Sequence, residues 1–232
     1  MQSDTPNDLK ILVLGESHTT AISKAVVKDM SRSIAAFDVR SRDKAEKFDI
    51  EPYQDLRPSA LVLAFGGTEH NIVGLIEANP RFDFILPPFD DFDVTRQAIP
   101  ASAIELLLSH RIKSGLGRAL LVRAAFDCPV FALAPPPPFR EIDEQTKLPS
   151  AFSGLLESGI TPAAIRRKLY AIQCHMMSKA YAEHGISLIS APTAALDSDG
   201  FLHRKLWGRD PTHGNERYGS LLLTHLTETI DV

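Results

Sequence analysis

Cysteine is scarce in this sequence. Only Cys128 and Cys174 occur among 232 residues, and neither has a second cysteine nearby. A disulfide framework needs more cysteines, and a Cys-x-x-Cys metal site needs closely spaced ones, so these two cysteines fit neither. We therefore predict a reduced, cytoplasmic protein in which the two thiols are buried.

Long apolar runs are also missing. The longest, residues 60–65, has six residues, whereas a helix that spans a membrane needs about 18 or more. The first ten residues, MQSDTPNDLK, are polar and contain no apolar stretch of the kind found in secretory signals. The sequence thus predicts no membrane association, in keeping with a cytoplasmic location.

An excess of positive charge is absent too. The formal net charge is −4, so no basic surface for nucleic acid is expected. Hydrophobic residues make up 44% of the chain and charged residues 23%, which is close to the average for folded globular domains. Together with the length, this composition predicts one domain spanning residues 1–232.

Short apolar runs alternate with segments of helical periodicity. We expect buried strands at residues 10–14, 34–40, 61–65, 129–134 and 186–189. We expect helices at residues 18–31, 101–126, 161–185 and 215–229. The helix at 101–126 is predicted to break near Gly115 and Gly117, and the next to begin with Thr161 as N-cap and Pro162 as its first residue. Strands that alternate with helices predict a parallel sheet covered on both faces, which is a three-layer α/β/α sandwich.

Residues 80–100 interrupt this alternation. Their sequence, PRFDFILPPFDDFDVTRQAIP, predicts an insertion loop after the third strand. The phenylalanines of this loop have two interpretations: they bury the insertion against the core, or they cap a substrate pocket. They are Phe82, Phe84, Phe89 and Phe92.

Polar residues follow several strand ends, and in an open parallel sheet ligands bind at the carboxyl ends of the strands. Ser17 follows the first strand, directly after Gly15-Glu16. At such a turn the hydroxyl is accessible, and the backbone N–H lies at a helix N-terminus, where partial positive charge favours an oxyanion. Glu16 is expected to brace the turn. The same pattern also suits an ordinary helix-capping serine.

A second polar segment, DPTH at residues 210–213, precedes the last predicted helix. A serine nucleophile needs a base, and the base needs an acceptor that orients it. Asp210 and His213 can supply both if the carboxylate binds one imidazole nitrogen and the other faces outward. Trp207 and Arg209, just before them, are expected to contact the substrate. A capping aspartate followed by a surface histidine is the alternative interpretation.

These segments and their order resemble the SGNH (GDSL-type) hydrolases, a superfamily of esterases and acylhydrolases. Gly15-Glu16-Ser17 is similar to the family's Gly-Asp-Ser block, and Asp210 with His213 to its Asp-x-x-His block. The resemblance implies a flavodoxin-like fold with a five-stranded parallel sheet in the strand order 2-1-3-4-5. It also implies a catalytic triad of Ser17, His213 and Asp210 that needs neither a metal nor a cofactor.

The oxyanion-binding blocks match the family less closely. Gly66-Gly67-Thr68 replaces the family's Gly-x-Asn, so Thr68 takes the place of the asparagine whose amide binds the oxyanion. Asn71, three residues further on, is an alternative donor. The family's glycine after the second strand is missing, and a backbone N–H near Arg42 would replace it. The resemblance thus implies oxyanion or substrate binding by Gly67, by Thr68 or Asn71, and by Arg42.

Two further features near the predicted site have alternative interpretations. His18, Glu69 and His70 could ligate zinc, although no metal-binding spacing supports this. His70 is otherwise a polar residue that lines the site. The four prolines at residues 135–138 form either a rigid wall of the site or an exposed polyproline ligand for SH3-like domains.

The residues and the resemblance together predict a serine esterase or acylhydrolase that cleaves or transfers an ester-linked acyl group. The expected partner is a small-molecule or carbohydrate ester, without nucleic acid, membrane, metal or cofactor. A catalytically weak or inactive SGNH-like carbohydrate-binding module is the alternative, favoured by the altered oxyanion blocks and opposed by the intact Ser–His–Asp set. A metal-dependent hydrolase that uses the histidine cluster is a third. The substrate and the oligomeric state stay open.

Overall fold

A five-stranded parallel sheet lies at the centre of the computed structural model, which describes residues 9–29, 33–40, 48–142, 146–149, 152 and 156–231. Its strands are β1 (Ile11–Gly15), β2 (Ile34–Asp38), β3 (Ala60–Ala64), β6 (Val130–Leu133) and β7 (Ser187–Ile189). They lie in the order β2-β1-β3-β6-β7. Counted within this sheet alone, that is the predicted order 2-1-3-4-5, and the predicted α/β architecture is confirmed.

The central strands are buried on both faces, as their uninterrupted apolar sequences predict. Every residue of β1 and of β3 is buried. Successive side chains of a strand point to opposite faces, so Ile11 and Val13 enter one core, and Leu12 and Leu14 enter the other. Each face therefore requires a layer of helices to exclude water from it.

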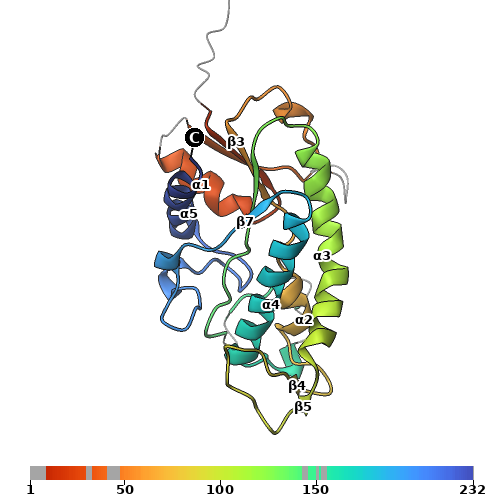
Figure 1. Cartoon of the computed structure of the whole chain (residues 1–232). Helices are drawn as coiled ribbons and strands as arrows, with labels where there is room; N and C mark the ends of the chain where they lie inside the picture. The colour runs from red at the N-terminus through yellow and green to blue at the C-terminus, as the bar shows by residue number, and fades with distance from the viewer. Residues whose placement is uncertain are drawn as a thin grey trace, which may run out of the picture.

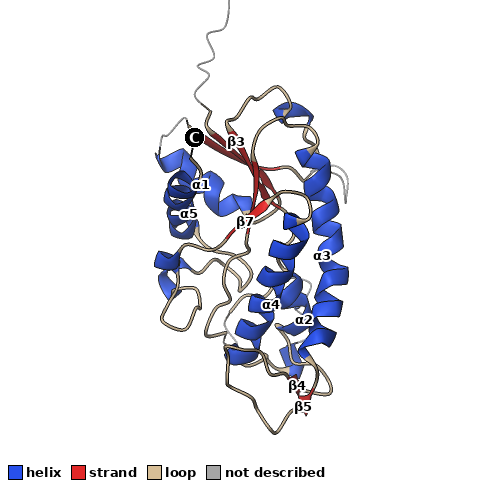
Figure 2. Cartoon of the chain, in the orientation of Figure 1, coloured by secondary structure: helices blue, strands red, loops and turns tan. Residues whose placement is uncertain are grey.

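Two helical layers cover the sheet. On one face α1 (Thr19–Asp29) packs against α5 (Glu216–Thr229). On the other face lie α3 (Ala101–Arg123) and α4 (Ala163–Ala182), with the short α2 (Glu69–Gly74) beside α4. The sheet runs between the two layers (Figure 1), and the strands in Figure 2 are flanked by helices on both sides. None of the helices in the described part of the chain is long and apolar enough to cross a membrane.

Helix α3 continues through Gly115 and Gly117, so the predicted break is wrong. Gly115 instead provides a close contact with the loop after β3. A β-carbon on Gly115 would lie 3.2 Å from Cα of Gly66, which is tighter than ordinary van der Waals contact. The missing side chain thus lets the helix approach the loop.

The start of α4 also differs from the prediction. The helix begins at Ala163, so Pro162 precedes it, and no side chain caps its first turn. Thr161 contributes through its backbone, because its carbonyl oxygen accepts a hydrogen bond of 2.9 Å from Nε of the buried Arg166. Arg166 thus anchors the backbone just before the helix, and the predicted cap by the Thr161 side chain is wrong.

The insertion at residues 80–100 is mostly loop, with a two-residue parallel ladder between β4 (Phe82–Asp83) and β5 (Gln97–Ala98). Phe84 is fully buried in the core beneath α3 and α4. The guanidinium of Arg167 on α4 lies 4.7 Å from the ring centre of Phe89. The phenylalanines of the insertion line neither cavity at the carboxyl edge of the sheet. They bury the insertion, and the interpretation as a pocket cap is wrong.

Both cysteines are free and only partly buried, whereas the sequence analysis predicts that both are buried. Cys128 follows the end of α3, and Cys174 lies on α4. Burial raises the pKa of the Cys174 thiol to about 11. This thiol therefore stays protonated at neutral pH and is a poor nucleophile.

Candidate active site

The turn between β1 and α1 carries Ser17 at the carboxyl edge of the sheet. The backbone N–H and the hydroxyl of Thr19 both donate to the carbonyl oxygen of Glu16, at 3.0 and 2.7 Å. The N–H of Thr20 donates to the carbonyl oxygen of Ser17 at 3.1 Å. These bonds start the helix directly after the strand, and they hold Ser17 at the junction of the two.

Glu16 braces this turn, as predicted. Its Oε2 accepts a hydrogen bond of 3.1 Å from the backbone N–H of Gly66 in the loop after β3. Its Oε1 lies 2.9 Å from Nε of Arg118 on α3. The carboxylate therefore links the loop after β1 to the loop after β3 and to a helix of the opposite layer.

Asp210 and His213 form the pair that the sequence spacing predicts. Nδ1 of His213 lies 2.9 Å from Oδ1 and 3.0 Å from Oδ2 of Asp210. An ionised carboxylate can only accept, so Nδ1 carries the proton and Nε2 carries the lone pair. Nε2 is buried and has no hydrogen-bond partner in the described structure. The imidazole is therefore held in the tautomer of a general base.

Thr212 strengthens this pair, and the sequence analysis overlooks it. Its hydroxyl donates to Oδ1 of Asp210 at 2.6 Å, and its backbone N–H donates to the same oxygen at 2.9 Å. Burial by itself would raise the pKa of Asp210, but the hydrogen bonds from His213 and Thr212 outweigh it and lower that pKa to about 2. The carboxylate is therefore ionised at neutral pH and can stabilise an imidazolium.

Ser17, Asp210 and His213 all line one surface cavity of about 560 Å³. Trp207 and Arg209 line it too, so both stand where contact with a substrate was predicted. The structure thus brings together residues from opposite ends of the chain, since the loops after β1 and before α5 meet at the carboxyl edge of the sheet.

The predicted oxyanion residues Gly67, Thr68 and Asn71 lie in the loop after β3 and in α2. The N–H of Gly67 donates to Oε2 of Glu69 at 2.8 Å. Thr68 precedes α2, and Asn71 lies within that helix with 4% of its surface exposed. None of Gly67, Thr68 and Asn71 lines the cavity of Ser17 and His213. Arg42, the remaining predicted donor, is outside the residues that the structure describes.

His18 lies beside the base and lines the same cavity, whereas the sequence analysis considered it only as a possible zinc ligand. Its ring centre lies 5.1 Å from that of His213, and the two rings are tilted by 40°. Both of its ring nitrogens are buried without a hydrogen-bond partner. The sequence did contain a signal, because a residue that directly follows Ser17 at the start of a helix must lie at the same edge of the sheet.

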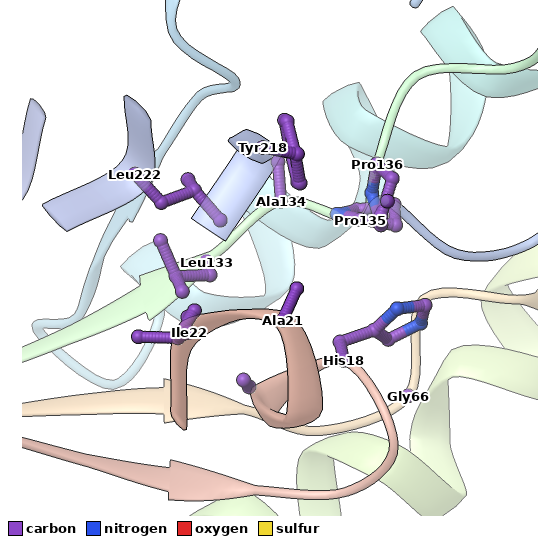
Figure 3. A pocket seen from close by; sticks show the side chains of 12 residues that line it. His18, Ala21, Ile22, Gly66, Leu133, Ala134, Pro135, Pro136, Tyr218 and Leu222 are labelled. Atoms are coloured by element: carbon purple, nitrogen blue, oxygen red, sulfur yellow. The ribbon is translucent and has the colours of Figure 1, made fainter. Parts of the chain in front are cut away.

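A second, smaller cavity adjoins the first and shares His18, Ala21 and Gly214 with it. Its volume is about 20 Å³. Figure 3 shows His18 on one side of this cavity, with Pro135 and Pro136 opposite its ring and apolar side chains at the far end. The hydroxyl of Tyr218, which belongs to the wall, is buried without a partner. The remaining lining residues are Ile22, Ala64, Gly66, Leu133, Ala134 and Leu222.

The four prolines at 135–138 are all buried. Pro135 and Pro136 belong to the wall of the small cavity, and the carbonyl oxygen of Pro135 accepts a hydrogen bond of 3.0 Å from the Tyr170 hydroxyl. The prolines therefore form a rigid wall of the site, and the interpretation as an exposed polyproline ligand is wrong.

His70 belongs to a buried hydrogen-bonded group on α2 and α4. Its Nδ1 lies 2.9 Å from Oε1 of Gln173, whose amide nitrogen donates to Oε2 of Glu69 at 2.8 Å. Burial lowers the pKa of His70 to about 4 and raises the pKa of Glu69. Among the described residues, no group of three His, Cys, Asp or Glu side chains is arranged to hold a metal ion.

Comparison with known proteins gives structural neighbours only, since no protein-family model and no curated protein matches the sequence. The extracellular lipase of Streptomyces rimosus is similar with a TM-score of 0.51 and 11% identity, over 95% of this chain and 99% of the lipase. The periplasmic domain of a lipopolysaccharide acetyltransferase from Salmonella ser. Paratyphi A gives 0.50 and 14%, over 95% and 83%. A GDSL-like lipase from Bacteroides thetaiotaomicron gives 0.49 and 11%, over 95% and 87%.

The chain therefore has the fold of the SGNH hydrolases, and the resemblance noted from its motifs is confirmed at the level of the fold. At these identities the likeness concerns the backbone architecture. The chemistry depends on the residues of the site itself.

Proposed function

We propose that this chain is a serine esterase or acyltransferase of the SGNH type, in which Ser17 is the nucleophile, His213 the general base and Asp210 the residue that orients the base. The observation that supports this most strongly is the state of His213. Its Nδ1 is bound by an ionised Asp210, its Nε2 has no hydrogen-bond partner in the described structure, and His213 lines a cavity that Ser17 also lines.

The reaction follows from these positions. Oγ of Ser17 attacks the acyl carbonyl carbon while its proton passes to Nε2 of His213, and Asp210 stabilises the imidazolium that forms. The tetrahedral intermediate collapses when the bond to the leaving alcohol breaks and His213 protonates the departing oxygen. The acyl group is then bound to Ser17. Water or a second alcohol, deprotonated by His213, attacks this acyl-enzyme and releases the acid or a new ester.

Hydrolysis and transfer share the acylation of serine and differ only in the final acceptor. The structural neighbours include both a lipase and an acetyltransferase, so the fold accommodates either outcome. The cavity of about 560 Å³ has room for a small-molecule or carbohydrate alcohol.

The acyl group is a short one. About 10–15 Å³ of such volume holds one water molecule, so the adjoining apolar cavity of about 20 Å³ admits a single small group, such as the methyl of an acetyl ester. His18 and Ala21 line both cavities. An acyl chain that enters from Ser17 therefore passes directly from the larger cavity into the smaller one.

One observation favours the alternative, a catalytically weak or inactive carbohydrate-binding module. The backbone N–H groups of Gly66 and Gly67 already donate to the carboxylates of Glu16 and Glu69. They are therefore not free to bind an oxyanion, and losing one such donor typically costs about 10²–10³ in rate.

A fluorophosphonate probe separates the two candidates, since it phosphonylates an activated serine and leaves an inactive one untouched. We expect the wild-type protein to gain one phosphonyl group on Ser17, located by peptide mass spectrometry, and the Ser17→Ala variant to gain none. Ser109→Ala, which removes an exposed hydroxyl on α3, is the matched control and should label like the wild type. A wild-type protein that stays unlabelled and does not hydrolyse p-nitrophenyl acetate would support the binding module.

A further inference from the structure

A substrate at Ser17 requires a hydrogen-bond donor for the oxygen of its reacting carbonyl, because negative charge develops there in the transition state. The loop after β3 offers few such donors. The N–H groups of Gly66 and Gly67 are bonded to carboxylates at 3.1 and 2.8 Å. The side chains of Thr68 and Asn71 do not line the cavity.

The ring of His18 lies between the base and this loop. Its centre is 5.1 Å from the ring centre of His213. On another side, its Nε2 lies 3.6 Å from the position that a β-carbon on Gly67 would occupy. Figure 3 shows the side chain extending from the start of α1 toward Gly66. His18 thus lines the same cavity as its neighbour in sequence, the proposed nucleophile Ser17.

Both ring nitrogens of His18 are buried without a hydrogen-bond partner. A neutral imidazole has one N–H donor and one acceptor, and burying either without a partner costs stability. Packing alone would be served better by an apolar residue. An N–H donor without a partner in this cavity is free to bind the oxyanion that forms in the transition state.

The surroundings of His18 keep its imidazole neutral. Burial is the largest cause that lowers its pKa to about 3, and the nearby His213, His70 and Arg40 act in the same direction. Asp210 alone acts in the opposite direction. At neutral pH the ring therefore retains one N–H and does not compete with His213 for the serine proton. A neutral imidazole can polarise a carbonyl in this way.

We propose that His18 is a catalytic residue that donates a ring N–H to the oxyanion and so replaces the missing asparagine amide. This proposal rests on the proposed function, since it requires an acyl intermediate on Ser17.

Two isosteric variants test it. Gln and Met have nearly the same length and shape, but only Gln carries an amide donor. We expect His18→Met to lower kcat on p-nitrophenyl acetate by about 10²-fold or more with less than about a threefold change in KM. His18→Gln should recover at least about tenfold of that loss. The pH profile of kcat/KM should keep its midpoint in both variants, because His18 does not take the serine proton.

Thermal melting shows whether each variant folds. His18→Leu and His18→Asn form a second isosteric pair if the first is unstable. The proposal is overturned if Met and Gln, or Leu and Asn, have the same kcat, because the position would then act through packing. It is equally overturned if the loss appears in KM alone.

The Ser17→Ala variant, assayed in parallel, distinguishes this proposal from the proposed function. If turnover requires Ser17 but does not require a hydrogen-bond donor at position 18, only the proposed role of His18 is wrong. Turnover that persists in Ser17→Ala would contradict the proposed function, and with it the role of His18.

Discussion

Lys168 of α4 and the histidines at the carboxyl edge of the sheet have buried nitrogen atoms, but these nitrogens differ in whether they have hydrogen-bond partners. The ammonium group of Lys168 is fully buried beneath the insertion and donates to Oδ1 of Asp83 at 2.6 Å, to the carbonyl oxygen of Phe84 at 2.9 Å and to that of Asp91 at 2.8 Å. At the sheet edge, both ring nitrogens of His18 and Nε2 of His213 are buried and bind nothing in the described structure.

Buried groups with all their hydrogen bonds formed contribute to stability, whereas buried groups with unused donors or acceptors are candidates for function. A lysine ammonium has three N–H donors, and all three are used at Lys168. Arg96 behaves similarly, since its guanidinium binds both oxygens of Glu77 and one of Asp93. Such groups hold the insertion on the fold. The histidines at the sheet edge instead leave part of their hydrogen-bonding capacity unused, and under the proposed function this capacity is available for a substrate.

Removing the base should have the largest effect, and it should fall on activity. We expect His213→Ala to lower kcat/KM on p-nitrophenyl acetate by about 10³-fold or more. The free energy of unfolding, measured by urea denaturation, should change by no more than about 2 kcal/mol, because only the hydrogen bonds to Asp210 are lost. Activity within tenfold of the wild type would mean that another group is the base.

Removing the buried charge of Lys168, which lies on α4 beneath the insertion, should lower stability and leave activity unchanged. We expect Lys168→Met to lower the free energy of unfolding by about 3–5 kcal/mol, because Asp83 stays buried without its cation. The specific activity of the folded fraction should not change. Arg204→Met is the matched control, since its ion pair with Glu141 is exposed and should contribute less than about 0.5 kcal/mol. If the two variants lose equal stability, the insertion does not depend on its buried pair.

The free energy of unfolding should decrease at acidic pH because of the two buried histidines. Burial lowers the pKa of His18 to about 3 and of His70 to about 4, whereas unfolded histidine titrates near about 6.5. Below pH 6.5 or so the unfolded chain therefore binds protons that the folded chain excludes. Stability is then lost as the pH falls, by about 1.4 kcal/mol per pH unit for each histidine.

The effect is tested by comparing the wild type with His70→Gln between pH 7 and pH 5, because the raised pKa of Glu69 acts in the opposite direction in both proteins. The lowered pKa of Asp210, about 2, makes a contribution that is retained above the unfolded pKa of about 3.9 and lost only at lower pH. Urea denaturation of the wild type and of His70→Gln across that range should give a shallower pH slope for the variant. Equal slopes would show that His70 is not held neutral.

The smallest expected effect is on the preference for a short acyl group. We expect p-nitrophenyl acetate to react at least about tenfold faster than the butyrate, judged by kcat/KM, because two more methylenes exceed the small apolar cavity. Leu222→Ala enlarges that cavity and should narrow the preference. Thr224→Ala, an exposed residue on the same helix, should leave it unchanged. An equal preference in all three proteins would place the acyl chain elsewhere.

Short local patterns in the sequence were enough to predict the architecture. Each of the five strands was predicted within a few residues from a short apolar run, and in β1 and β3 burial on both faces leaves no polar position. Asp210 and His213 were paired correctly from their spacing, since three residues at a turn bring the carboxylate to Nδ1. Neither inference required knowledge of distant contacts.

Contacts between distant segments account for what the sequence analysis missed. Gly115 was expected to break a helix, but its missing side chain allows the close approach to Gly66. Thr161 was expected to cap α4, but the helix begins at Ala163 without a side-chain cap. Propensity describes a residue in isolation, and a neighbour brought close by folding can outweigh it.

The sequence by itself determined the alternation of strands and helices, the nucleophile candidate at a strand end and the Asp–His pair, because each is encoded within a few consecutive residues. Only the tertiary structure decided which hydrogen-bond donors at the carboxyl edge of the sheet are already occupied. Glu16 reaches Gly66, and Gln173 reaches Glu69, across 50 and 104 positions of chain, and the two carboxylates occupy the N–H groups of Gly66 and Gly67. Burial, which depends on every packed layer at once, then leaves His18 neutral and unpartnered beside Ser17.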